Sequence, residues 1–426
     1  MIDSGLVTDI RAAADALTDK GVAFLGNLVA EGSLLGEEQG AQNLMADEFA
    51  RLGLAVERFD IDLDKIRHLP GFSPPVIDNY TGRENVIGLH RSSGSGKSLI
   101  LNGHIDVVPT GPAHLWTDPP FKPVVRDGRL YGRGSADMKA GIMAYCLAFE
   151  ALKELGLQPA APVIMQSVIE EECTGNGALA CLAAGYRADA AVIPEPFSQS
   201  LMIAQLGVMW LTIDLTGHPA HVLDTSNGIN AIEAAYEVFD ALRELEGEWN
   251  KAENRHACFH GHNHPVCFNL GKVTGGDWAS TVPCAATIDV RVGFYPGMTL
   301  GEVRGQIEAK VAEAIATRPG LRMAKAKISY HGFQAEGCAM DREAPLMTTL
   351  AAAHARITNT PIQEVASTAT TDARFFQLYG KIPATCYGPK GGATHSLDEW
   401  VDIASTIEVA QVLAVFMAEW CGVEKR

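Results

Sequence analysis

The outer parts of the chain alternate between helical periodicity and short apolar runs. Apolar residues recur at helical spacing over 7–30, 37–53, 138–156, 344–357 and 402–420. Continuous apolar runs typical of buried strands occupy 98–103, 161–169, 188–193 and 382–388. Continuous apolar strands separated by helices predict an α/β domain with a mainly parallel sheet covered by helices.

The middle of the chain follows a different order. Strand patterns occupy 208–217, 266–276, 286–294 and 322–330, and helical patterns occupy 228–247 and 300–317. The resulting order is βαββαβ, which is the ferredoxin-like arrangement. We therefore expect one inserted domain at 207–331, within an outer domain made of residues 1–206 and 332–426.

Composition narrows the classes of function. Lys and Arg number 34 and Asp and Glu 51, and the net charge of −17 argues against nucleic acid or an anionic membrane as a partner. The nine cysteines include no CxxC pair, which favours reduced thiols and a cytoplasmic location. We expect no signal peptide, and no apolar run approaches the roughly 18 residues of a membrane span.

Side chains able to bind a metal ion lie at the ends of the predicted strands. His104 follows the strand at 98–103, and Glu170, Glu171 and Glu172 follow the strand at 161–169. Ligands of α/β proteins collect at the carboxyl ends of strands, and histidine with carboxylates suits zinc or a similar divalent ion. The candidate ligands are His104, Asp137, Glu171, Glu172, Glu195 and His395.

Each candidate also has an ordinary structural explanation. Taken alone, His104 is a core histidine, Asp137 a helix cap and Glu195 a turn residue. Their joint placement at strand ends favours the metal site. Asp106 lies two residues after His104, so in extended chain its side chain faces the same way and can accept the second imidazole N–H. One of the neighbouring glutamates can bind metal while the other takes a proton from water.

The motifs resemble a known family. GHIDVVP, W-x-x-x-P-F, GRGSADMKAG, EEE-x-x-G-x-G, PEP, TDARFF and TH-x-x-DE have the order and spacing of the M20 co-catalytic zinc hydrolases. The chain is most similar to the acetylornithine deacetylase and succinyl-diaminopimelate desuccinylase branch, and it also resembles aminoacylases and carboxypeptidase G2. The resemblance spans nearly the whole chain. It implies a zinc-peptidase-like catalytic domain with an inserted lid that also forms a homodimer.

The resemblance also implies roles for individual residues. His104, Asp137 and Glu195 would hold one metal ion, and Asp137, Glu172 and His395 the other, so that Asp137 bridges them. Glu171 would be the general base, Asp106 the partner of His104, and Glu170 only a neighbour.

Three lid residues and one loop residue concern the substrate. His221 would reach the other subunit's site and stabilise the oxyanion, and Arg291 would bind a substrate carboxylate, with a surface ion pair as its alternative. Ser280 stands where many relatives carry Asn. GPKGG replaces the commoner GPG and places Lys390 near the substrate. These departures leave the acyl and leaving groups open.

Three other features are weaker. GSGKS at 94–98 resembles a phosphate loop, but the full pattern needs glycine where Arg91 stands, and the segment precedes a strand instead of following one. The four histidines of 256–264 lie in the inserted domain and are interpreted as a loop. Cys173 is interpreted as packing, because nearby carboxylates disfavour a thiolate.

The main hypothesis is a metal-dependent hydrolase of the amide bond in a small N-acyl amino acid or N-acyl amine. Metal-activated water would attack the amide and Glu171 would act as base. The expected cofactors are two divalent ions, Zn²⁺ first and Co²⁺ or Mn²⁺ as alternatives. The rival hypotheses are a metallodipeptidase or aminopeptidase of the same family, a metal-bound binding protein without catalysis, and a nucleotide-dependent transferase that rests on GSGKS alone.

Overall fold

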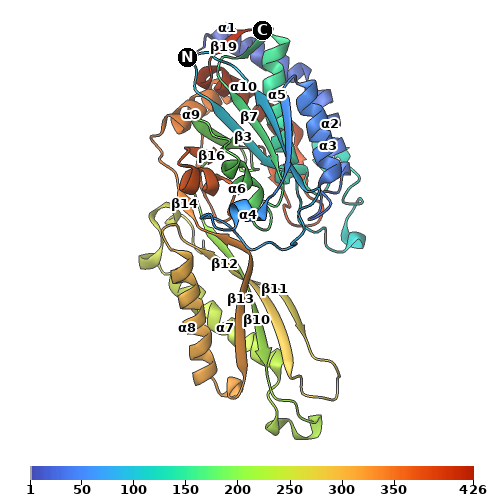
Figure 1. The fold of residues 1–426 in the computed structure, drawn as a ribbon, viewed down its shortest axis with the longest axis vertical. Coiled ribbons are helices and arrows are strands. Elements are labelled where there is room, and N and C mark those ends of the chain that lie inside the picture. The colour runs from blue at the N-terminus through green and yellow to red at the C-terminus, as the bar shows by residue number, and fades with distance from the viewer. Residues whose placement is uncertain (1) are drawn as a thin grey trace.

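The computed structural model describes residues 2–426. The first and last parts of the chain together form one domain around a central sheet (Figure 1). This sheet has six strands in the order β1-β2-β7-β3-β8-β16. They are β1 Ala55–Asp60, β2 Glu84–His90, β3 Leu99–His104, β7 Val163–Val168, β8 Ala190–Ile193 and β16 Ala384–Cys386. The pairs β7–β3, β3–β8 and β8–β16 are parallel, and β1–β2 and β2–β7 are antiparallel. The predicted mainly parallel sheet is confirmed, with an antiparallel edge that the apolar pattern did not indicate.

Helices cover both faces of this sheet. Gly88 of β2 lies against Phe49 of α3, whereas the Asn85 amide, on the opposite face, donates to the Gly177 carbonyl of α6. The helices of the domain are α1 Ser4–Ala16, α2 Thr18–Ala30, α3 Gln39–Arg51, α4 Leu63–Ile66, α5 Ala140–Glu154, α6 Asn176–Ala183, α9 Pro345–Thr358 and α10 Ile403–Trp420.

The single helix expected over 7–30 is two helices. The chain leaves α1 at Leu17 and begins α2 at Thr18. The Thr18 hydroxyl donates to the Asp15 carbonyl at 2.8 Å, in competition with the backbone N–H groups that would continue the helix. The apolar periodicity runs across this break, because both helices pack on the same core.

Helix α10 has the length and the mean hydropathy, 1.4, of a membrane-crossing helix. The sequence pattern did not indicate this, because no continuous apolar run of that length occurs there. Within the described residues, 78% of that segment is buried inside the domain, where it packs against α5 and α9. Its apolar surface is therefore used in the core.

The inserted lid domain has the predicted βαββαβ order, and its sheet extends away from the outer domain (Figure 1). The elements are β10 Gly207–Thr216, α7 Ala231–Trp249, β11 Phe268–Gly275, β12 Ala285–Phe294, α8 Leu300–Thr317 and β13 Lys325–Ala335. The strand order is β11-β12-β10-β13, and all three pairs are antiparallel. Along β10, Ile213 and Leu215 are buried and Asp214 and Thr216 are exposed, so one face packs on the helices and the other faces solvent. The ferredoxin-like lid is confirmed.

The two domains have separate hydrophobic cores. Strand β13 continues to Ala335, past the expected boundary at 331, so the division at 206 and 331 stays a prediction. Beside the junction lies a small sheet of β9 Leu201–Gln205, β14 Cys338–Ala339 and β15 Glu364–Ser367.

A second small sheet joins distant parts of the outer domain. It consists of β4 Val124–Arg126, β5 Arg129–Tyr131, β17 Gly391–Gly392 and β18 Trp400–Asp402. Because β5 pairs with β18, the segment that precedes Asp137 lies beside the segment that follows His395. Strands β6 Leu157–Pro159 and β19 Val423–Lys425 pair near the C-terminus.

We predict that Leu413→Ala lowers the free energy of unfolding by about 2–5 kcal/mol, because it opens a cavity where α10 packs in the core. Leu413 is fully buried. Urea unfolding followed by circular dichroism measures the change. Leu115→Ala is the matched control: Leu115 is 54% exposed, and its loss should change stability by no more than about 0.5 kcal/mol. Equal effects of the two substitutions would contradict the assignment of α10 to the core.

Candidate metal centre

The predicted metal-binding residues converge at one end of the central sheet. His104 is the last residue of β3 and lies opposite Val168, the last residue of the parallel strand β7. The glutamates of the EEE triplet follow β7, and Glu195 follows β8 by two residues. Parallel neighbours end at the same edge of a sheet, so their following residues meet there.

Asp137 lies between the two histidines. Its Oδ1 is 3.2 Å from His104 Nε2, and its Oδ2 is 3.4 Å from His395 Nε2. His104 Nε2 is also 3.7 Å from Glu195 Oε1 and 3.9 Å from Glu171 Oε2. On the other side, His395 Nε2 is 3.1 Å from Glu172 Oε2. The five predicted metal ligands and Glu171 thus form one cluster, in which the Asp137 carboxylate faces both imidazole rings.

Asp106 supports this group differently from the expectation. The acceptor at 2.9 Å from His104 Nδ1 is the Asp106 backbone carbonyl, and the nearer carboxylate oxygen is 3.7 Å away. A carbonyl only accepts, so Nδ1 carries a proton, and Nε2 is the ring nitrogen that faces the carboxylates. The Asp106 carboxylate instead accepts the backbone N–H groups of Glu171 at 3.2 Å and Glu172 at 3.1 Å. One residue therefore orients both the histidine and the glutamate turn.

Burial raises the pKa of several carboxyl groups in and beside this cluster of side chains. It raises the pKa of Glu171 well above its usual range; the charge of His104 opposes this, and Asp372 and Glu195 add to it. Burial also raises the pKa of Glu195, again against the effect of His104, and that of Asp106 to about 7. In low dielectric a carboxylate avoids charge unless a cation or hydrogen-bond donors compensate.

At Asp137, His104 and His395, neighbouring groups of opposite charge outweigh the effect of burial on the pKa. Burial would raise the pKa of Asp137, but hydrogen bonds from His104 and His395 lower it. Burial would lower the pKa of His104, but Asp137, Glu195 and Glu171 raise it well above its usual range. The charge of Glu172 leads the effects that raise the pKa of His395 to about 11. The cluster therefore attracts positive charge strongly.

The donor set fits divalent metal ions. Donor atoms of His104, Glu171 and Glu195 lie within 4.8 Å of one another, and so do those of His104, Asp137 and Glu172. Glu171 Oε1 is buried without a hydrogen-bond partner among the described residues. Imidazole nitrogen with several carboxylates and no thiolate suits zinc, cobalt or manganese.

Glu170, expected only as a neighbour of the site, has a structural role in the turn after β7. It is fully buried and has a positive φ of 65°, and it accepts from Tyr80 at 2.5 Å, Arg83 at 2.8 Å and Thr174 at 2.7 Å. These contacts hold the turn from which Glu171 and Glu172 project. The sequence contained no local signal for them, because Tyr80 and Arg83 come from a distant loop.

Asp372, within the TDARFF motif, is a buried acid whose position was not predicted. Both of its carboxylate oxygens lack a hydrogen-bond partner among the described residues. Burial raises its pKa to about 6, and the charges of Arg374 and His104 lower it. The charge of Asp372 also raises the pKa of Glu171 and of Glu195.

The lid residues do not join the cluster within this chain. His221 is exposed, and its ring bonds to the Leu223 N–H at 3.1 Å. Ser280 is exposed in the turn after Trp278. Arg291 donates weakly to the carbonyls of Cys267 at 3.4 Å and Thr368 at 3.3 Å and forms no ion pair within residues 2–426. The role of Arg291 therefore stays a prediction.

Lys390 lies on a loop that runs alongside the cluster. A Cβ on Gly388 would lie 2.2 Å from the Glu195 carbonyl oxygen, and one on Gly391 would lie 2.5 Å from the Ala136 Cβ. On Gly392 it would lie 2.6 Å from the Trp400 ring. The Lys390 side chain between these glycines is exposed.

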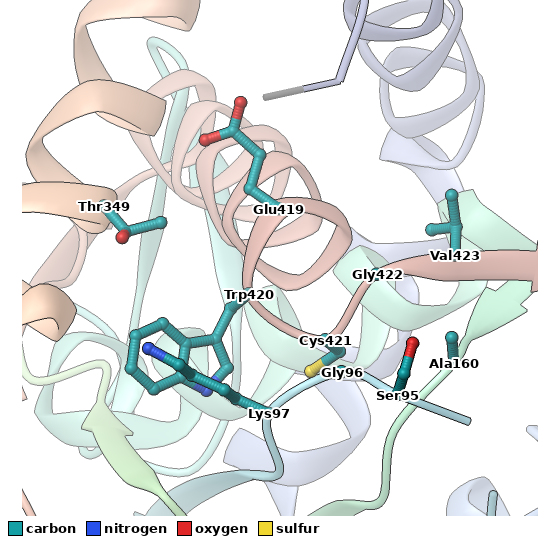
Figure 2. Close-up of a pocket in the computed structure, with 10 residues that line it drawn as sticks. All are labelled: Ser95, Gly96, Lys97, Ala160, Thr349, Glu419, Trp420, Cys421, Gly422 and Val423. Atoms are coloured by element: carbon teal, nitrogen blue, oxygen red, sulfur yellow. The ribbon is translucent and has the colours of Figure 1, made fainter. Parts of the chain in front are cut away.

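The weaker sequence features do not contribute to the cluster. GSGKS borders a hollow of about 480 Å³ at the start of β3, the opposite end of that strand from His104, where Lys97 stacks 4.5 Å from the Trp420 ring (Figure 2). In the loop at 256–264, His264 pairs with Glu246 at 2.5 Å. Cys173 is buried, which raises its pKa, and all nine cysteines are free.

Many curated proteins are similar to this chain, and two of them are described here. The N-formyl-4-amino-5-aminomethyl-2-methylpyrimidine deformylase of Bacillus subtilis is 29% identical over 377 residues, covering 83% of this chain and 87% of that protein. The succinyl-diaminopimelate desuccinylase of Delftia acidovorans is 28% identical over 397 residues, covering 88% and 92%.

Among solved structures, the di-peptidase Dug1p from Saccharomyces cerevisiae superposes with a TM-score of 0.81 at 14% identity, over 98% of this chain and 99% of that one. Human carnosine dipeptidase 1 gives a TM-score of 0.75 at 16% identity, over 97% and 99%. At these identities the likeness concerns the fold. The model of peptidase family M20/M25/M40 matches residues 100–419, which include every strand end of the cluster. The chain therefore belongs to peptidase family M20/M25/M40.

Proposed function

We propose that this chain hydrolyses the amide bond of a small N-acyl amino acid or N-acyl amine, with Glu171 as general base. Membership of its family makes the chain a metal-dependent amide hydrolase. The observation that carries the assignment of residues is the position of Asp137 between two histidines, with Glu171 beside them. The relatives named as a deformylase and a desuccinylase support an N-acyl substrate.

His104, Asp137 and Glu195 would hold one divalent ion, and Asp137, Glu172 and His395 the other. Zinc is the ion we propose first, with cobalt or manganese as alternatives. When bound, such ions polarise a carbonyl oxygen and lower the pKa of water.

Glu171 is placed to move the proton. One of its oxygens faces His104 at 3.9 Å, and the other has no partner among the described residues. A carboxylate with a free oxygen in a buried site can accept a proton from water and return it to the departing amine. Asp106 holds the Glu171 N–H and so limits the directions in which this side chain can point.

We also propose that a homodimer completes the site through the lid, with His221 of the partner subunit stabilising the oxyanion. Two exposed features support this. Leu223 is 89% and Trp278 72% exposed, near the His221–Thr281 bridge, and β11 is an open sheet edge with mostly exposed residues. The free cysteines support a cytoplasmic location.

We predict that Glu171→Gln lowers kcat by about 10²–10⁴-fold and leaves metal binding intact, because the carboxamide cannot accept the proton. The assay uses metal-stripped protein reloaded with zinc, cobalt or manganese, on N-formyl, N-acetyl and N-succinyl amino acids and amines, with dipeptides as the competing class. Metal content is measured in parallel. Turnover on dipeptides alone would favour the dipeptidase alternative. Undiminished turnover in the variant would remove Glu171 from the base role.

We predict that Arg291→Ala raises KM for substrates that carry a carboxylate by at least about tenfold and leaves carboxylate-free N-acyl amines unaffected, because a charged hydrogen bond is worth about 1.5–3 kcal/mol. Steady-state kinetics on both substrate types measure the difference. Arg322→Ala removes the same charge from an exposed lid position and serves as control. An equal KM change for both substrate types would contradict carboxylate binding.

Mixing of two inactive variants tests the shared site. His221→Ala and Glu171→Gln homodimers should each lose at least about 100-fold in activity. After exchange of subunits about half of the dimers are mixed, and one of their two sites is intact, so about a quarter of the wild-type activity should return. Light scattering gives the oligomeric state. If the mixture stays inactive although the subunits exchange, His221 acts within its own chain. A His221→Ala homodimer with wild-type activity would show that His221 has no role.

A further inference from the structure

A buried ion pair lies directly behind the candidate metal centre. Arg133 Nη1 donates to Glu399 Oε2 at 2.5 Å, and both side chains are almost fully buried. The two residues are far apart in sequence, and the pairing of β5 with β18 brings them together. Neither has been given a role in the proposed function.

Glu399 holds the segment that ends in Asp137. Its Oε2 also accepts the Gly134 N–H at 3.1 Å, and its Oε1 accepts the N–H groups of Ala136 at 3.0 Å and of Asp137 itself at 3.1 Å. Both oxygens are therefore saturated by donors from one loop. The last of these donors belongs to the backbone of the carboxylate that faces both histidines.

Arg133 connects the other two segments. Its Nη2 donates to the Ser396 carbonyl at 3.0 Å, directly after His395, and more weakly to the Pro109 carbonyl at 3.4 Å, on the segment that follows His104. The Trp116 ring lies 5.3 Å from the guanidinium carbon. One guanidinium thus connects the segments that follow the two histidines, while its partner carboxylate holds the segment that leads to Asp137.

This arrangement is costly if its purpose is stability alone. A buried ion pair often contributes no more to stability than a well-packed apolar pair of the same volume. In addition, Arg133 Nε is buried without a partner among the described residues, which adds a desolvation cost. Its distinctive property is that it contacts all three loops through directional bonds.

We propose that Arg133 and Glu399 are positioning residues that set the relative placement of His104, Asp137 and His395 and thereby the affinity for the metal ions. This inference rests on the proposed function, since it assumes that these three residues bind metal. The pair touches no substrate. Its effect is exerted through the backbone of the loops that carry the ligands.

Glu399→Gln and Arg133→Lys test the proposal. A carboxamide keeps only one acceptor oxygen. Its NH₂ group would face either the Arg133 guanidinium and the Gly134 N–H or the N–H groups of Ala136 and Asp137, so hydrogen-bond donors would oppose each other in both orientations. Lysine keeps the charge but cannot span the Ser396 and Pro109 carbonyls as a planar fork does. We expect each variant to bind zinc or cobalt about 10–100-fold more weakly, with an altered visible spectrum of the cobalt-loaded protein. Isothermal titration and metal analysis after dialysis give the affinities.

Glu150→Gln is the matched control. Glu150 is a buried glutamate that pairs with Lys20 and Arg51 and lies outside the ligand-bearing loops. We expect it to lower thermal stability without changing metal affinity or the cobalt spectrum. If Glu399→Gln does not fold, Arg133→Lys decides alone.

Folded variants with wild-type metal affinity and spectrum would overturn the positioning role, while the proposed function would stand. A wild-type chain that binds no divalent ion would contradict the proposed function itself and this inference with it. If Glu150→Gln lowered the metal affinity as much as Glu399→Gln does, general destabilisation of the fold would explain the loss of affinity. That result would also overturn the proposal.

Discussion

Burial of negative charge is the constraint on which the site depends. Asp106, Glu171, Glu195 and Asp372 are buried, and Asp137 lies among them, with two imidazole rings as the nearest positive partners. Water compensates such charge easily, and a protein interior does not. The structure meets the cost with backbone N–H groups aimed at Asp106 and Glu399, with histidines on both sides of Asp137, and with a donor set suited to divalent ions.

The two domains divide the work of a metal-dependent amide hydrolase. The outer domain brings acid and histidine side chains to one sheet edge through parallel strands, and the network around Glu170 stiffens the turn after β7. The lid keeps its own core. The guanidinium of its Arg291, for which we propose a role in binding substrate, reaches the Thr368 carbonyl of the outer domain.

Much of this arrangement could be predicted from the sequence, because strand ends carry local signals. His104 and Glu195 follow apolar runs, and the βαββαβ order of the lid follows from its change of periodicity. What could not be predicted depends on contacts between distant segments. The pairing of Arg133 with Glu399 requires the β5–β18 register, and the support of Glu170 requires a loop about 90 residues earlier. The carbonyl that accepts the His104 N–H depends on the backbone turn after β3, which side-chain spacing does not encode. Strand β1 was not predicted because it is only partly buried and has no continuous apolar run, and β2 beside it was not predicted either.

The loop from Gly388 to Gly392 limits how this enzyme can diversify. Side chains at Gly388, Gly391 and Gly392 would collide with the Glu195 carbonyl, Ala136 and the Trp400 ring, whereas position 390 projects into solvent beside the cluster. Within this loop, position 390 can therefore accept almost any side chain without disturbing the carboxylates. An engineer who wished to alter substrate preference would therefore start at position 390, which stands between glycines where an added side chain would collide with the rest of the domain.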